Sequence, residues 1–260
     1  MNRIDRKFQN LRSAKEKALA VFVTAGYPRV DSTAAIIRAL EEGGADLVEL
    51  GMPYSDPLAD GPVIQQSSAA ALANGVTLES ILADVRMIRS SSDLPIVLMG
   101  YLNPILRFGE ESFFLQAAAA GVDGMILPEI PLEEFGRFSD LLQAQDLAGI
   151  LLVTPATGGD RIRIIDEKSS GFLYCVSTTG VTGMHGGNGV DDYLKRVRDH
   201  VRKNPLMVGF GIATPDDARR FGTSVDGVIV GSAFIRFLAT DPSPEAIGRW
   251  AREFKRVLQP

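Results

Sequence analysis

Eight short apolar runs, separated by amphipathic segments with helical spacing, constrain the fold of this chain more than any other feature. Most of these runs are apolar at successive positions, which is typical of parallel strands that are covered on both faces. Eight strands, each followed by a helix, in about 250 residues predict an α/β fold, the (β/α)8 TIM barrel. The predicted strands are Ala18–Ala25, Leu47–Met52, Pro95–Tyr101, Val122–Leu127, Gly149–Pro155, Phe172–Ser177, Leu206–Phe210 and Val225–Val230.

The ends of the intervening helices support this alternation. We expect Asp31–Ser32 to cap one helix, which Gly43–Gly44 ends, and Thr77 to precede another. Ser243–Pro244 opens the last one. An open doubly wound sheet is the alternative, but no GxGxxG motif follows the first strand. The 260 residues therefore predict one domain, residues 1–260.

Two further helices are expected beyond the eight repeats. Ile4, Phe8 and Leu11 have helical spacing ahead of the first strand, so this extra N-terminal helix can cover the bottom of the barrel. A second extra helix, Pro62–Ala73, follows the second strand. Insertions after barrel strands lie on the catalytic face, so this connection is the first place to look for a site.

Composition excludes several classes of protein. The net charge is −5 with no basic cluster, which argues against a nucleic-acid partner. The longest apolar runs are about seven residues, whereas a membrane span needs roughly 20. The first residues lack the apolar stretch of a secretory signal. The single Cys175 fits a reducing cytosol, so we expect a cytoplasmic protein, and His185 and His200 leave little for a metal site.

Glu49 is the first candidate for chemistry. Val48 and Leu50 flank it in the second strand, so alternation directs Glu49 to the opposite face. If that face is the barrel interior, burial raises the pKa of the carboxyl and makes it a usable proton donor and acceptor near neutrality. A carboxyl satisfied by a neighbouring amide or lysine is the plain alternative.

Asp60 is the second candidate, in the proline-stiffened loop that follows this strand. Pro62 at the first turn of the next helix places Asp60 near the helix N-terminus, where the dipole favours an anion. The same position is typical of an N-cap residue. The residues alone leave both interpretations open.

Three glycine-bearing turns end the sixth, seventh and eighth predicted strands. Barrels often bind phosphate there, because backbone N–H groups of the last loops converge on an anion. We expect phosphate at Gly183, Gly211, Gly231 and Ser232. Backbone amides should do most of the binding, since no Lys or Arg lies at those turns.

The absence of certain residue types from the predicted strand ends excludes several reaction mechanisms. No lysine lies at the carboxyl end of a predicted strand, where a Schiff-base aldolase would need one. Cys175 with two histidines cannot build a metal centre, and no Ser-His-Asp arrangement suggests itself. Acid–base chemistry by carboxylates on a phosphorylated substrate remains.

The residues from Glu49 to Pro62, ELGMPYSDPLADGP, resemble the signature of the tryptophan synthase alpha chain family. The resemblance extends through Phe22–Gly26, Gly180–Gly183, Gly209–Ile212 and Gly231–Ala233. It implies a barrel that cleaves indole-3-glycerol phosphate to indole and glyceraldehyde 3-phosphate, a carbon–carbon lyase of tryptophan biosynthesis without a cofactor of its own. It also implies a beta-chain partner that carries pyridoxal phosphate, in an alpha2beta2 tetramer.

The resemblance assigns roles to individual residues. Glu49 moves protons at indole C3 and at the glycerol hydroxyl, and Asp60 accepts the indole N–H. Pro53 and Asp56 match positions that contact the beta chain. Thr182 lies on a loop that closes beside Asp60. The substrate-binding residues are Phe22, Tyr101, Ile126, Tyr174, Thr182 and Phe210, and Met99 and Leu152 also match the indole pocket.

Departures from the family pattern leave other functions open. Glu129 stands where the family commonly has an aspartate, and the loop after Gly183 is rich in glycine. A free-standing indole-glycerol-phosphate lyase keeps the same acids as the two-subunit enzyme. A weakly active barrel that mainly activates a beta chain, or another phosphate-binding barrel such as a phosphoribosyl isomerase, are further alternatives.

Overall fold

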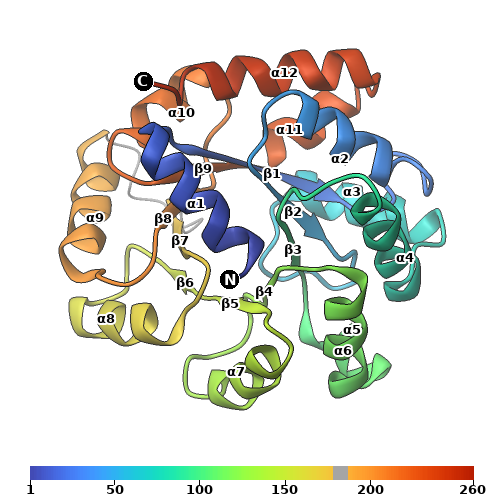
Figure 1. Ribbon diagram of the computed structural model, residues 1–260, viewed down its shortest axis with the longest axis horizontal. Coiled ribbons are helices and arrows are strands. Elements are labelled where there is room, and N and C mark those ends of the chain that lie inside the picture. The colour runs from blue at the N-terminus through green and yellow to red at the C-terminus, as the bar shows by residue number, and fades with distance from the viewer. Residues whose placement is uncertain (178–186) are drawn as a thin grey trace.

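A curled parallel sheet surrounded by helices forms the body of the molecule (Figure 1). The computed structural model describes residues 1–177 and 187–260. The strands follow the order β5-β4-β3-β2-β1-β9-β8-β7-β6, and every neighbouring pair is parallel. The strands are β1 (Ala18–Thr24), β2 (Leu47–Gly51), β3 (Ile96–Met99), β4 (Gly124–Ile126), β5 (Ala148–Ile150), β6 (Leu152–Val153), β7 (Leu173–Val176), β8 (Leu206–Gly209) and β9 (Gly227–Val230).

The predicted (β/α)8 barrel is confirmed, with one change in the fifth strand. Strands β5 and β6 are the two halves of that predicted strand, and Leu151 separates them. They form the two ends of the sheet order, so the chain itself brings these ends together into a nearly closed barrel.

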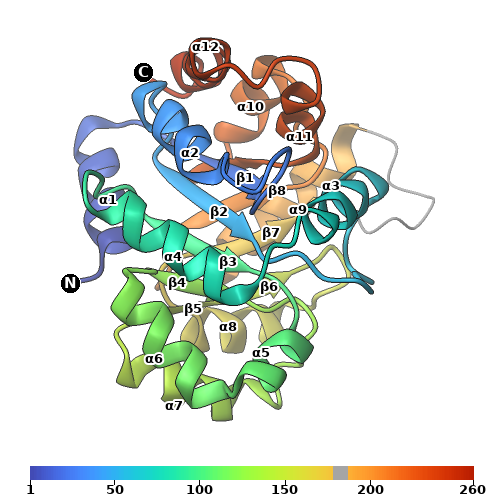
Figure 2. The same cartoon turned by 90° about the vertical axis from the view of Figure 1, so that its right-hand side faces the viewer.

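Helices alternate with the strands and cover the outside of the sheet (Figure 2). They are α1 (Arg3–Ala14), α2 (Thr33–Glu42), α3 (Pro62–Ala73), α4 (Leu78–Arg89), α5 (Leu102–Phe108), α6 (Glu110–Ala120), α7 (Phe135–Ala144), α8 (Gly159–Lys168), α9 (Gly187–His200), α10 (Pro215–Gly222), α11 (Ser232–Leu238) and α12 (Pro244–Arg256). No helix within residues 1–177 and 187–260 is long and apolar enough to cross a membrane.

The predicted helix starts are correct, but the capping differs. Thr77 accepts from the Ser80 amide in a full capping box at the start of α4. The Ser32 hydroxyl donates instead to the Arg29 carbonyl, at 2.6 Å, and does not cap α2. Ser243 likewise bonds to Asp241 at 2.6 Å rather than capping α12. A nearby acceptor outside the helix competes successfully for these hydroxyls.

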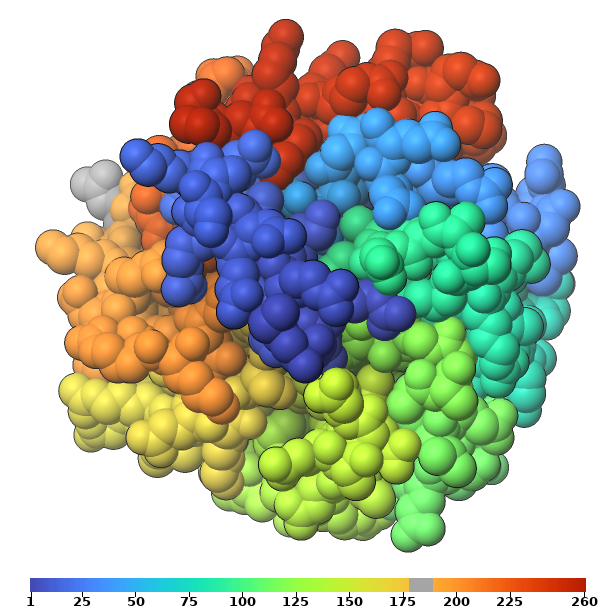
Figure 3. Space-filling model, in the orientation of Figure 1, coloured from blue at the N-terminus to red at the C-terminus, as the bar shows by residue number. Residues whose placement is uncertain are grey.

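Helix α1 covers the bottom of the barrel, as its apolar spacing predicted. In Figure 1 it crosses the centre of the view, and in Figure 3 the dark blue N-terminal segment covers the middle of this face. Ile4, Phe8 and Leu11 are buried beneath it, and the ring of Phe8 lies 6.2 Å from that of Phe172. Helix α1 therefore fills the centre of this face of the barrel.

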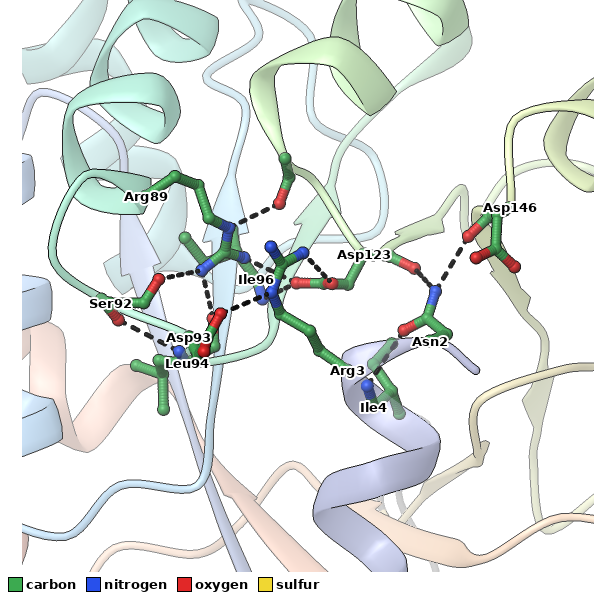
Figure 4. Close-up of polar contacts among 11 residues, drawn as sticks. Asn2, Arg3, Ile4, Arg89, Ser92, Asp93, Leu94, Ile96, Asp123 and Asp146 are labelled. Carbon is green, nitrogen blue, oxygen red and sulfur yellow. Dashed lines mark hydrogen bonds and ion pairs between the residues drawn. The ribbon is translucent and has the colours of Figure 1, made fainter.

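Aspartates at the bottom of the barrel bond to the amides of neighbouring strands. Asp46 accepts from Leu19 N at 2.9 Å, and Asp226 accepts from Leu206 N at 2.8 Å. Asp123 accepts from Ile96 N at 2.8 Å and forms ion pairs with Arg3 and Arg89 (Figure 4). Each of these carboxylates ties the start of one strand to the loop that precedes another. Such contacts at the N-terminal face serve stability.

Helix α3 lies beside the upper end of β1, with the bounds predicted from the sequence. The hydroxyls of Thr24 and Ser67 are 2.7 Å apart and buried, which joins the end of β1 to this helix. Because Asp60 and Gly61 directly precede α3, this contact also fixes where the loop after β2 ends.

Candidate active site

A cavity of about 170 Å³ opens at the carboxyl ends of the barrel strands. Carboxyl groups, aromatic rings and glycine turns from distant parts of the chain meet in its wall. The lining residues are Phe22, Glu49, Asp60, Gly61, Ile64, Met99, Tyr174, Phe210, Gly211, Ile212, Ala213, Ile229, Gly231, Ser232, Ala233 and Arg236. This is the face on which barrel enzymes carry their active sites.

Glu49 points into the barrel interior, which identifies the face of β2 that alternation left open. It pairs in register with Phe22 of β1, and both side chains line the cavity. The residue is 1% exposed, and its Oε1 atom has no hydrogen-bond partner. Burial raises the pKa of the carboxyl to about 8. Glu49 is therefore protonated at neutral pH, so it can donate a proton.

Two glycines at strand ends make room for the aromatic walls beside Glu49. A Cβ atom on Gly51 would lie 2.4 Å from Cζ of Phe22. One on Gly209 would lie 2.1 Å from the hydroxyl oxygen of Tyr174. Both rings need the space that a side chain would fill. Burial, with Glu49 nearby, raises the pKa of the Tyr174 phenol well above its usual value, so it stays neutral.

Asp60 lines the same cavity and is not a helix cap. The N-cap of α3 is Gly61, so the capping interpretation of Asp60 is wrong. Burial raises the pKa of Asp60 to about 6, and a hydrogen bond from the Tyr101 hydroxyl opposes this rise. At pH 7 Asp60 is therefore largely ionised while Glu49 is protonated. Two carboxyls in one cavity thus hold opposite protonation states.

Tyr101 acts on the loop that carries Asp60 and does not line the cavity. Its hydroxyl accepts from Ala59 N at 2.9 Å, and its ring centroid lies 5.2 Å from that of Tyr54. Tyr54 in turn accepts from the Asn103 amide at 2.9 Å. Tyr101 therefore holds this loop, and its predicted contact with substrate stays a prediction.

The other predicted pocket residues divide into two groups. Phe22, Met99, Tyr174 and Phe210 line the cavity. Ile126 is fully buried and, like Leu152, does not line it. Ile126 pairs in register with Met99 of β3 and Ile150 of β5. Ile64 and Ile229 also line the cavity, and nothing but their apolar side chains indicated this beforehand.

The glycine turns form the end of the cavity at β8 and β9. Gly211, Gly231 and Ser232 line it, while Gly183 and Thr182 lie outside the described residues. The backbone of Phe210 and Gly211 is left-handed there, with φ values of 68° and 78°. Such conformations in non-glycine residues gather at functional sites.

Arg236 also lines the cavity, which the sequence analysis missed. No Lys or Arg lies at the glycine turns themselves, but Arg236 brings a cation to the same cavity from the next helix. The available signal was the spacing: Arg236 follows Ser232 by four residues, and positions i and i+4 share one face of a helix.

Of the two predicted partner contacts in the loop after β2, Pro53 is buried and Asp56 is exposed. Pro53 lines a separate groove of about 490 Å³ with Tyr54 and residues of α4 and α5. Asp56 is exposed and accepts from the Ser55 hydroxyl at 2.5 Å. Leu58, between Asp56 and Asp60, is 95% exposed.

Glu129 lies in the loop after β4, and its carboxylate accepts a hydrogen bond from Leu102 N at the start of α5. The side chain of a glutamate, longer than that of an aspartate, reaches this amide from that loop.

Metal chemistry has no evident site in the part of the chain described here. Residues 1–177 and 187–260 contain no group of three or more His, Cys, Asp or Glu side chains placed to hold a metal ion. Cys175 is buried within β7, and burial raises the pKa of its thiol to about 12. It behaves as a core residue.

A (β/α)8 barrel with a cavity at the carboxyl ends of its strands, lined by two carboxyls of raised pKa, has the architecture of a barrel enzyme. The sequence matches the family model described as tryptophan synthase alpha chain over residues 8–255. The chain belongs to this family, whose role is the cleavage of indole-3-glycerol phosphate in tryptophan biosynthesis.

Individual relatives agree with this assignment. The tryptophan synthase alpha chain of Geotalea daltonii is 48% identical over 91% of this chain and 90% of the relative. The subunit alpha structure from Legionella pneumophila superposes with a TM-score of 0.91 at 36% identity, covering 99% of this chain and 98% of that one. An aminoacrylate-bound tryptophan synthase from M. tuberculosis gives a TM-score of 0.89 at 32% identity, with both chains fully covered.

Proposed function

We propose that this chain is a carbon–carbon lyase that splits indole-3-glycerol phosphate by proton transfer between Glu49, Asp60 and the substrate. The observation that carries the proposal is the pair of opposite protonation states in one cavity. Burial brings the pKa of Glu49 to about 8 and that of Asp60 to about 6. Near pH 7 the first is an acid and the second an anion, which is what a retro-aldol cleavage through indole requires.

The indole ring can replace the imine or metal of other aldolases. Protonation of C3 by Glu49 gives an indolenine with a positively charged ring nitrogen. Asp60 accepts the N–H hydrogen bond and stabilises that charge. The bond from C3 to the glycerol carbon then breaks, and its electrons return to the ring. The hydroxyl on that carbon loses its proton to Glu49 and becomes the aldehyde, so Glu49 ends protonated as it began. This sequence needs no cofactor.

The cavity walls suit the two ends of such a substrate. Phe22, Ile64 and Tyr174 offer apolar and aromatic surface to the indole, next to Glu49. Gly211, Gly231 and Ser232 form the other end, where main chain can approach a phosphate closely. We propose this end as the phosphate site, with Phe210 between the two.

The pH dependence of kcat/KM for indole release from indole-3-glycerol phosphate tests the proposal. The free enzyme should lose activity below about pH 6, as Asp60 gains a proton, and above about pH 8, as Glu49 loses one. We expect a bell-shaped profile with its maximum near pH 7. Activity that rises steadily through pH 9 would contradict the role of Glu49 as the proton donor.

We also propose a tryptophan synthase beta chain as partner, in an alpha2beta2 tetramer within the cytoplasm. One loop carries Asp60, the buried Pro53 and the exposed Asp56, so docking there can order the site. The almost fully exposed Leu58 supports an interface at this loop. High turnover of the isolated chain, unchanged by a beta chain, would favour the free-standing lyase instead.

A further inference from the structure

We infer that Arg236 binds the phosphate group of the substrate and sets the preference of this site for a dianionic ligand. This inference rests on the proposed function and adds a side-chain charge to a site that was expected to use backbone amides. Among the described residues that line the cavity, Arg236 is the one cation.

The packing of α11 directs Arg236 to the cavity. Phe234, Ile235 and Leu238 are buried on the other side of the helix. The ring of Phe234 lies 4.8 Å from that of Trp250 in α12, which fixes the rotation of α11 about its axis. Ser232 and Arg236 then share the face that lines the cavity, and helix side chains lean towards the N-terminus, where Gly231 and Ser232 lie.

The charge of Arg236 is available to a ligand. Some arginines on the outer helices pair with acids, as Arg163 does with Asp160 and Arg219 with Asp216. Arg236 is exposed and forms no ion pair with any described residue, so its guanidinium lies uncompensated at the mouth of the cavity. The cavity beyond it holds the unpartnered Oε1 of Glu49, which independently marks this space as a ligand site.

The geometry and the charges divide the cavity into two ends. The carboxyls of Glu49 and Asp60 lie on the β2 side, where an anionic phosphate would be repelled by ionised Asp60. Arg236 lies on the α11 side with the glycine turns, and a guanidinium fork can bind two phosphate oxygens at once. A phosphorylated substrate is therefore oriented with its phosphate towards α11 and its reacting carbon towards Glu49.

The test compares Arg236→Gln with Arg86→Gln, a matched change at an exposed arginine of α4 outside the cavity. Kd for glycerol 3-phosphate is measured by calorimetry, and kcat and KM are measured with indole-3-glycerol phosphate. We expect Arg236→Gln to raise both Kd and KM by about ten-fold and to change kcat less than about two-fold, since a hydrogen bond to a charged group is lost. Arg236→Lys should fall between, and Arg86→Gln should match wild type.

The salt dependence of Kd distinguishes a charge interaction of Arg236 with phosphate from a purely structural role of this residue. The difference in Kd between wild type and Arg236→Gln should shrink in about 1 M salt, where charges are screened over about 3 Å. Equal Kd values for Arg236→Gln, Arg86→Gln and wild type would overturn the inference, even if cleavage proceeds. Tight binding that depends on Arg236, without any cleavage of indole-3-glycerol phosphate, would support the inference and overturn the proposed function.

Discussion

Glu49 and Asp123 are two carboxyls buried to almost the same extent at opposite ends of one barrel, 1% and 2% exposed. Asp123 at the bottom accepts from Ile96 N and pairs with Arg89 at 2.6 Å and Arg3 at 3.1 Å. Oε1 of Glu49 at the top has no partner. The same chemical group is thus fully satisfied at one end and left partly unsatisfied at the other.

The difference appears in the protonation of the two acids. Burial raises the pKa of both. At Asp123 the Ile96 amide and the two guanidinium groups oppose that rise, whereas no group opposes it at Glu49, whose pKa reaches about 8. Asp123 serves the packing of the barrel, and Glu49 keeps a transferable proton at a cost in stability. Four variants and one titration can break or sharpen this contrast.

The largest expected effect is on turnover, and it should follow substitution of Glu49 at the top of the barrel but not of Asp123 at the bottom. Glu49→Gln should lower kcat for indole release by about 10² to 10⁴, because it removes the group that donates and accepts the proton. Asp123→Asn, assayed at a temperature where it is folded, should keep kcat within a few-fold of wild type. Retention of more than about a tenth of wild-type turnover by Glu49→Gln would remove it from the mechanism.

The second effect is on the free energy of unfolding, and it should follow substitution of Asp123 at the bottom of the barrel. Asp123→Asn leaves the Arg89 guanidinium, 9% exposed, without its closest anion. Breaking a buried ion pair in this way typically costs about 3 to 5 kcal/mol of unfolding free energy. Urea denaturation followed by circular dichroism measures it. A loss under about 1 kcal/mol would show that the network in Figure 4 contributes little.

A smaller effect is expected where the cavity meets its loop. Tyr101→Phe frees Ala59 N and removes the hydrogen bond to Asp60, so the pKa of Asp60 should rise and kcat/KM should fall by about ten-fold. The acid limb of the pH profile should move upward with it. Tyr193→Phe is the matched control, since it removes a buried hydroxyl that donates to Val153 O, outside the cavity. Equal effects of the two variants on kcat/KM would contradict a special role for Tyr101.

The smallest effect concerns the surface of the loop. Asp56→Ala should weaken activation by a beta chain a few-fold while basal turnover changes less, because Asp56 is exposed and touches no cavity residue. Steady-state indole formation is titrated with beta chain, and Asp93→Ala, an exposed acid at the bottom of the barrel, is the control. Identical activation curves for wild type and Asp56→Ala would exclude Asp56 from the interface.

The two ends also differ in how far the sequence predicts them. Period-two alternation placed Glu49 on the opposite face of β2 from Val48 and Leu50, and the nearly closed barrel then identified that face as the interior. The glycines after the last strands marked the end that lines the cavity. The break at Leu151 was not predictable, because apolar residues continue through it without interruption. Arg236 was missed because it lies a full helical turn beyond the glycine signal. The contacts of Tyr101 with Ala59 and Tyr54 were not predicted, because a strand pattern does not reveal them.

The most direct test of the central claim is the unfolding free energy of wild type and Glu49→Gln between pH 5 and pH 9. The folded-state pKa of Glu49, about 8, lies above its ordinary value of 4.5, so the native state holds a proton that the unfolded state has lost. Wild-type stability should therefore fall as the pH rises from about 4.5 to about 8, by up to about 5 kcal/mol at 1.36 kcal/mol per pKa unit. Glu49→Gln should match wild type near pH 5 and become several kcal/mol more stable at pH 9. A difference that does not change with pH, or a Glu49→Gln protein less stable than wild type at pH 9, would contradict the account.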